Sequence, residues 1–79
     1  FPNPFNPSTN ISFSIPSRAF VSLKVFDIRG REIATLINED LPAGLYTKEW
    51  NANSFSSGVY FYRIKAGNFI ATKKLVLVK

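Results

Sequence analysis

The stretch VSLKVFDIRGREIATLI, residues 21–37, decides which secondary structure the chain adopts. Its first five residues place apolar side chains at every second position, which is the pattern of a β-strand with one buried face: Val21, Leu23 and Val25 alternate with Ser22 and Lys24. The polar segment DIRGRE follows, in which Gly30 can adopt the left-handed backbone conformation that closes a short hairpin. Apolar residues resume over 33–37, so we predict two antiparallel strands joined by a turn after Asp27.

The same period recurs along the chain, and no stretch shows helical periodicity over the roughly ten residues that a helix needs. Turn signals separate the apolar runs: LPAG at 41–44, NANSFSSG at 51–58, and Gly67-Asn68. We therefore predict an all-β fold, an antiparallel β-sandwich of six to seven short strands, in which the seventh would lie near Pro2–Phe5. The six strands are expected at residues 11–15, 21–25, 33–37, 45–50, 59–66 and 69–78.

Three prolines precede the first strand in FPNPFNPSTNISFSIP, residues 1–16. Proline fixes φ and disfavours helix in the residue before it, so this opening enters the first strand in a stiff, extended form. Proline also lacks a backbone donor, which blunts an exposed sheet edge. These properties explain the stiffness but give no reason why a domain should begin this way.

A dense apolar core must stabilise so short a chain, because cysteine is absent and no disulfide or thiolate metal site can reinforce the fold. Aromatic residues make up 15% of the sequence and supply side chains of the necessary size. The alternating pattern assigns to this core one face of the last strand and the residues Phe13, Leu23, Val25, Ile33, Tyr46, Trp50, Tyr60, Tyr62 and Ile64.

The length of 79 residues allows one small domain, residues 1–79. The chain begins at Phe1 and contains no methionine, so we interpret it as a piece of a longer protein. It has no apolar signal-peptide segment and no apolar run near the roughly 18 residues that span a bilayer. The net charge of +5 could attract an acidic partner, but the basic residues are scattered, which is typical of a solvated surface.

The sequence offers little for catalysis, because it has neither histidine nor cysteine to activate a nucleophile. Ser22 and Lys24 share one strand face, a common pattern that does not by itself indicate a Ser-Lys pair. Glu39 and Asp40 could contribute to a calcium site, although solubilising a loop is the simpler interpretation. No glycine-rich stretch has the spacing of a phosphate cradle. We expect no enzymatic activity, no metal site and no cofactor.

The segment GVYFYRIKAG, residues 58–67, carries three successive aromatic residues on a predicted strand. Their side chains alternate between faces, so Tyr60 and Tyr62 lie opposite Phe61. One interpretation is a central strand covered by its neighbours. The alternative is an open partner surface, on which aromatic and basic residues stack nucleic-acid bases or sugars: Phe61, Arg63 and Lys65.

The chain ends in KLVLVK, residues 74–79, a strand that is apolar on both faces. Its leucines point one way and its valines the other, so one face can join the core while the other needs a neighbour or a partner. Lysines at positions 73, 74 and 79 flank it, as charged residues flank strands that would otherwise aggregate. The segment is either an ordinary protected strand or an edge that pairs with another protein's sheet.

Together these motifs resemble one family over nearly the whole chain. The segments PNPFNPST, FSIP, VSLKVFDIRGREIATL, LPAG, the tryptophan of EWN, SSGVYFYRIKAG and TKKLVLVK occur in its order and at its spacing. This family is the type A C-terminal sorting domain of type IX secretion substrates, which is similar to the immunoglobulin-like domain of flagellar hook-capping proteins. The resemblance implies an antiparallel immunoglobulin-like sandwich at the C-terminus of a larger exported protein.

The resemblance also implies a non-catalytic signal that carries an N-terminal passenger through the periplasm and outer membrane, to the medium or the cell surface. Its partners would be the outer-membrane translocon and a surface sortase that removes the domain and attaches the passenger to lipopolysaccharide. Nucleic acid and direct membrane insertion would play no part. Pro2, Asn3 and Pro4 would mark the domain boundary. Recognition would involve the final residues, Lys74, Leu75, Val76, Leu77, Val78 and Lys79.

Two positions depart from the family pattern. Lys48 shares strand parity with Tyr46 and Trp50, where the family usually has an apolar residue, so either its stem reaches the rim or this strand is less deeply buried. Asn51 stands where an aspartate is common, which should alter only hydrogen bonds of the loop. The alternative to a sorting signal is an accessory binding or adhesive sandwich, for carbohydrate or protein assembly, on a cell-surface protein.

Overall fold

The computed structural model describes residues 8–79, and this range contains six β-strands. Each of the six predicted strands is present. The predicted seventh strand near Pro2–Phe5 and the boundary motif Pro2, Asn3 and Pro4 lie outside the described residues. The strands are β1 Ser8–Ile15, β2 Ala19–Phe26, β3 Glu32–Leu41, β4 Gly44–Asn51, β5 Gly58–Ala66 and β6 Phe69–Leu77.

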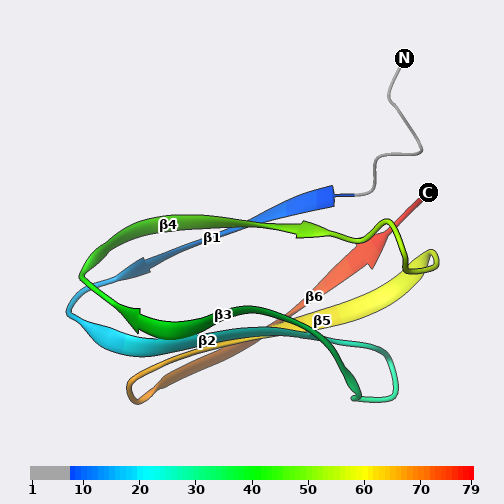
Figure 1. Ribbon diagram of the computed structural model, residues 1–79. Helices are drawn as coiled ribbons and strands as arrows, with labels where there is room; N and C mark the ends of the chain where they lie inside the picture. Colours follow the sequence, from blue (N-terminus) through cyan, green and yellow to red (C-terminus); the bar gives the residue numbers. More distant parts are fainter. Residues whose placement is uncertain (1–7) are drawn as a thin grey trace.

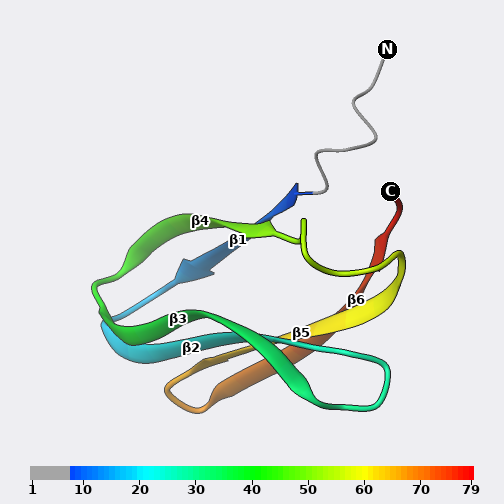
Figure 2. The same ribbon diagram turned by 45° about the vertical axis from the view of Figure 1, so that its right-hand side comes forward.

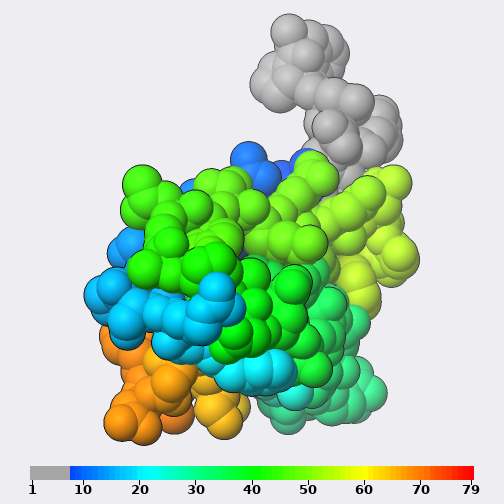
Figure 3. All heavy atoms as spheres, turned by 60° about the vertical axis from the view of Figure 1, so that its left-hand side comes forward, coloured from blue at the N-terminus to red at the C-terminus, as the bar shows by residue number. Residues whose placement is uncertain are grey.

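The strands form two antiparallel sheets (Figures 1 and 2). The larger sheet has the strand order β3-β2-β5-β6, and the smaller pairs β1 with β4. The smaller sheet covers one face of the larger, which confirms the predicted antiparallel sandwich. The β1–β2, β3–β4 and β5–β6 connections gather at one end, which comes forward in Figure 3, whereas the C-terminus and the start of β1 lie at the other.

Two tight turns form where glycine was predicted to permit them. Gly30 has a φ of +82°, and its N–H donates to the Asp27 carbonyl oxygen at 2.9 Å. Gly67 has a φ of +60° and forms, with Asn68, the two-residue connection between β5 and β6. A residue with a Cβ atom is strained in this left-handed region. Glycine therefore sets the geometry of both hairpins.

Strand β3 is longer and less regular than the pattern predicts. It continues past Ile37 to Leu41, so the interpretation of Glu39 and Asp40 as loop residues is wrong. Both acidic residues pair with β2, and this pairing extends the strand although its sequence there is polar. The register shifts twice along β2 and β3, and each shift inserts an extra residue that reverses the alternation of side chains.

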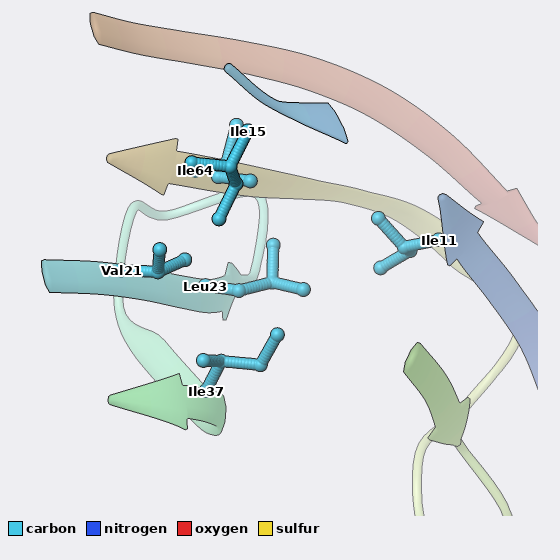
Figure 4. Close-up of a cluster of buried hydrophobic side chains, with 6 residues drawn as sticks. All are labelled: Ile11, Ile15, Val21, Leu23, Ile37 and Ile64. Carbon is cyan, nitrogen blue, oxygen red and sulfur yellow. The ribbon is translucent and has the colours of Figure 1, made fainter. Parts of the chain in front are cut away.

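The core lies between the two sheets in two adjoining clusters. The rings of Phe55 and Tyr60 pack against Trp50, with centroids 5.5 and 5.4 Å from the tryptophan ring. Figure 4 shows the first cluster, which contains Ile11, Ile15, Val21, Leu23, Ile37 and Ile64. The second cluster contains Val25, Trp50, Ala52, Tyr60 and Leu77.

The predicted core is right in part: Leu23, Val25, Trp50, Tyr60 and Ile64 are buried. Four other predicted core residues are only partly buried and pack against the clusters from outside: Phe13, Ile33, Tyr46 and Tyr62. Phe13 and Tyr62 line an open side of the sandwich, and the Tyr46 hydroxyl turns outward to donate to a backbone carbonyl oxygen. Buried residues that the prediction left out are Ile11, Ile15, Val21, Ile37 and Ala52.

Candidate recognition surfaces

The predicted recognition segment includes the end of β6, at an edge of the larger sheet. Strand β6 pairs with β5 on one side, and no strand within residues 8–79 pairs with it on the other. Leu77 is buried and Leu75 half-buried, whereas Val76 and Val78 have exposed fractions of 60% and 77%. The leucines therefore join the core, and the valines lie in solvent where a partner can reach them.

The last residue of the chain is held against the β4–β5 connection. The backbone N–H of Lys79 donates to Ser57 Oγ at 3.1 Å, and its Nζ donates to the Asn53 carbonyl oxygen at 2.8 Å. The Asn53 N–H donates in turn to Asn51 Oδ1 at 3.0 Å, so Asn51 takes part in the hydrogen bonds of this loop. These contacts hold the end of the segment beside the folded domain.

The structure brings Phe61, Arg63 and Lys65 together on the outer face of the larger sheet, because all three lie opposite outward residues of β2. The Arg63 guanidinium carbon lies 5.0 Å from the centre of the Phe26 ring, and Arg63 Nε donates to Thr72 Oγ1 at 3.2 Å. Phe61 is half-buried among its neighbours. This face therefore combines aromatic and basic side chains, as a partner surface would. The Arg63 guanidinium group, however, already contacts Phe26 and Thr72 within the domain.

A groove opens between β1 and β6, the two strands that border the same open side of the sandwich. It has a volume of about 240 Å³, and its lining includes the buried core residues Ile11 and Ile64. A second hollow of about 480 Å³ shares Ser14 and Phe69 with it and continues to Pro16. The two hollows thus share part of their lining and lie along the first half of β6, before the predicted recognition segment.

Asp27 braces the turn between β2 and β3. Its Oδ1 accepts hydrogen bonds from the backbone N–H groups of Arg29 and Arg31, each at 2.9 Å, and its Oδ2 accepts one from Arg31 Nε at 2.7 Å. The backbone hydrogen bond from Arg31 and then that from its guanidinium hold the pKa of Asp27 below its ordinary value of 3.8. The charged carboxylate thus fixes the turn.

The groups considered for catalysis and for metal binding lie on different strands, β2 and β3. Ser22 and Lys24 are on the outer face of β2, where Lys24 Nζ pairs with a Glu32 carboxylate oxygen at 3.3 Å. Asp40 pairs with Arg18 at 2.6 Å. Among the described residues, no three side chains of histidine, cysteine, aspartate or glutamate gather as a metal site would require.

No helix in the part of the chain that the structure describes is long and apolar enough to cross a membrane.

Lys48 lies where the parity of its strand predicted. It pairs with Ile11 of β1, yet its side chain is exposed. The inner face of β4 is therefore open to solvent at this position.

Charge is distributed unevenly, which the interpretation of scattered basic residues missed. Five of the ten basic residues and none of the five acidic residues follow Trp50, so this part of the chain carries the whole net charge. The basic residues lie on β5, on β6 and at the chain end, whereas the acidic ones lie on β3, on β4 and in the β2–β3 turn. Counting charges along the sequence would have revealed this separation.

Comparison with known proteins gives one family. The model of the secretion system C-terminal sorting domain matches residues 1–79. No curated protein and no solved structure gives a match. Domains of this family are sorting signals for type IX secretion, which delivers proteins through the outer membrane to the cell surface or the medium. With its all-β sandwich and its match along residues 1–79, the chain belongs to the family of type IX C-terminal sorting domains.

Proposed function

We propose that the type IX translocon and then a surface sortase recognise the segment Lys74–Lys79, and that the chain forms the C-terminal end of a larger exported precursor. The observation that supports this role is the exposure of Val76 in β6 and of Val78 directly after it, because β6 is an edge strand that has a partner strand on one side only within residues 8–79. Neighbouring apolar side chains that remain in solvent often mark a protein–protein interaction site. Their leucine neighbours anchor the same segment in the core, so the valines are presented in a fixed orientation.

The proposed role is non-catalytic and needs no cofactor. The N-terminal passenger of the precursor would supply any enzymatic activity, and Pro2, Asn3 and Pro4 would mark where the passenger's linker meets the domain. A stiff proline-rich junction suits this position because it separates two independently folded units. Processing by the sortase then requires access to this junction.

The test compares export of a fluorescent passenger fused to the chain, with and without Leu75–Lys79. We expect the deletion to abolish surface and medium fluorescence, whereas Phe61→Ala on the outer face has a smaller effect. Because the deletion also removes the buried Leu77, a second variant separates recognition from folding. Val76→Ser changes only an exposed side chain, and we expect it to reduce export by about tenfold, which corresponds to about 1.4 kcal/mol of binding.

Ile70→Ser is the matched control. Ile70 lies on the same strand and the same outward face as Val76, with a similar exposed fraction of 57% against 60%. Both serine variants should remain folded by circular dichroism, and only Val76→Ser should lose export. Equal export of the two variants, or full export of the deletion, would remove the recognition role of this segment.

A further inference from the structure

We propose that the groove between β1 and β6 is a docking site for an extended β-strand of the secretion machinery, and that this strand carries a carboxylate facing Lys73. The inference rests on the proposed function, because it assigns the strand to the machinery that binds the end of β6. It adds the mode of binding, which is addition of a strand to the sheet edge, and the chemistry of the partner.

The backbone of β6 is available for this pairing. Strand β6 is nine residues long and has β5 on one side only, so its other edge presents N–H and C=O groups that no strand within residues 8–79 uses. Strand β1 is likewise an edge strand of the smaller sheet, with β4 as its single partner. A strand entering between them can extend the larger sheet and lie against the side chains of β1.

The side chains around this edge favour an occupant that is partly apolar. The apolar lining of the groove comes from Ile11 and Phe13 of β1, from Ile64 of β5, and from Phe69 and Ala71 of β6. Phe69 pairs with Ala66 and lies on the inward face of β6, yet its exposed fraction is 61%. A large apolar side chain on an inward face that remains in solvent indicates that part of the sandwich is left uncovered.

Lys73 gives the groove its selectivity. It lies opposite Tyr62, whose ring packs against the core, so Lys73 is also on the inward face and lines the groove. An inward charge on an edge strand rejects purely apolar strands, because pairing would bury the ammonium group without a partner. A carboxylate at the facing position of an incoming strand removes this penalty by forming a cross-strand ion pair.

The surrounding charge supports an acidic partner over a second copy of the chain. Strands β5 and β6 carry four basic residues, Arg63, Lys65, Lys73 and Lys74, and no acidic one. Pairing of two β6 strands would bring two lysine-rich edges together, which like-charge repulsion disfavours. Long-range electrostatic attraction favours the approach of an acidic strand to this edge, and complementary charges stabilise the strand once it is bound.

The test is a nuclear magnetic resonance titration of the 79-residue chain with a short capped peptide. Every second residue of the peptide is threonine, and the residues between the threonines are, in order, valine, glutamate and valine. We expect this peptide to shift backbone amide signals of β6 and β1, and a twin peptide with lysine in place of glutamate to bind about tenfold more weakly. Lys73→Glu should reverse this order and favour the lysine peptide.

Lys48→Glu is the matched control, because Lys48 is also an exposed lysine at an inward position, but on β4, outside the groove. It changes the net charge by the same amount and should keep the preference for the glutamate peptide. The proposal is wrong if neither peptide shifts β6, if the signals that move belong to β3 or β4, or if both lysine variants change the preference equally. Self-association that Lys73→Glu abolishes, without peptide binding, would assign the groove to a second copy instead.

Export separates this inference from the proposed function. The inference expects Lys73→Glu to reduce passenger export while Lys48→Glu leaves it unchanged. If both are exported normally and Val76→Ser is not, strand addition is wrong and recognition of the final segment stands. If Val76→Ser and the deletion of Leu75–Lys79 are both exported normally, recognition of that segment fails whatever the peptides do.

Discussion

Trp50 is the largest of the fully buried side chains, and its environment explains why one residue matters so much in a short chain. It projects from β4 into the second core cluster, where Phe55 and Tyr60 contact it edge-on or tilted. Aromatic pairs in this arrangement stabilise beyond the area that they bury. With no disulfide in the chain, this cluster supplies much of the cohesion between the two sheets.

We predict that Trp50→Ala lowers the free energy of unfolding by about 3–5 kcal/mol, because it leaves a cavity between the sheets. A domain of this size has a total stability of about 5–15 kcal/mol, so the variant should be largely unfolded or melt far below the parent. Phe20→Ala is the control, since Phe20 is an aromatic residue with an exposed fraction of 56%. Thermal unfolding followed by circular dichroism that gave the same midpoint for both variants would refute this core assignment.

At this scale the sequence predicted which side chains point inward, but not how deeply each one is buried. Ile11, Phe13 and Ile15 share one parity, as the alternation indicates, and all three belong to or contact the first cluster. The two isoleucines are buried, whereas Phe13, which lines the β1–β6 groove together with Ile11, is only partly buried. Burial depends on which strands border an open side, and alternation along one strand carries no information on that.

At the scale of elements, hairpin turns were predictable and strand lengths were not. Gly30 and Gly67 take the left-handed conformation that their turns require. The extension of β3 to Leu41 was missed, since a polar run on an edge strand pairs through its backbone and leaves no apolar pattern. The two bulges were missed for a related reason, because an inserted residue changes parity without any change in composition.

The turn between β2 and β3 gives a prediction about pH. Asp27 has a pKa below its ordinary value of 3.8 because its carboxylate accepts hydrogen bonds from Arg31 and Arg29. A carboxylate whose pKa is lower in the folded state stabilises the protein above its unfolded pKa, and this contribution disappears as the pH falls through the folded pKa. We therefore expect Asp27→Asn to melt below the parent at neutral pH and the difference to shrink below about pH 4.

The measurement is the melting temperature of both proteins over a series of pH values. Glu32 also has a lowered pKa, from hydrogen bonds with Thr35 and Lys24, but it is present in both proteins and cancels in the comparison. A difference in melting temperature that stays constant down to about pH 3 would show that the charge of Asp27 does not brace the turn.

At the scale of the whole molecule, fold class and family were evident from the sequence, whereas the open side was not. The motifs and their order predicted the sandwich and the sorting role, and the family match along residues 1–79 confirms both. The groove depends on strand order, which places β1 and β6 at neighbouring edges. Neither turn chemistry nor alternation specifies strand order. The sequence alone therefore indicates only that Lys73 protects an edge strand, and its position in the groove follows from the strand order.

These 79 residues act as a type IX export signal. The most direct measurement fuses them behind a fluorescent passenger delivered to the periplasm, in a host with a type IX system and in its translocon-deficient twin. We expect fluorescence at the surface or in the medium of the intact host alone. Passenger retained in the periplasm of both hosts, with the fusion shown to be folded, would contradict it.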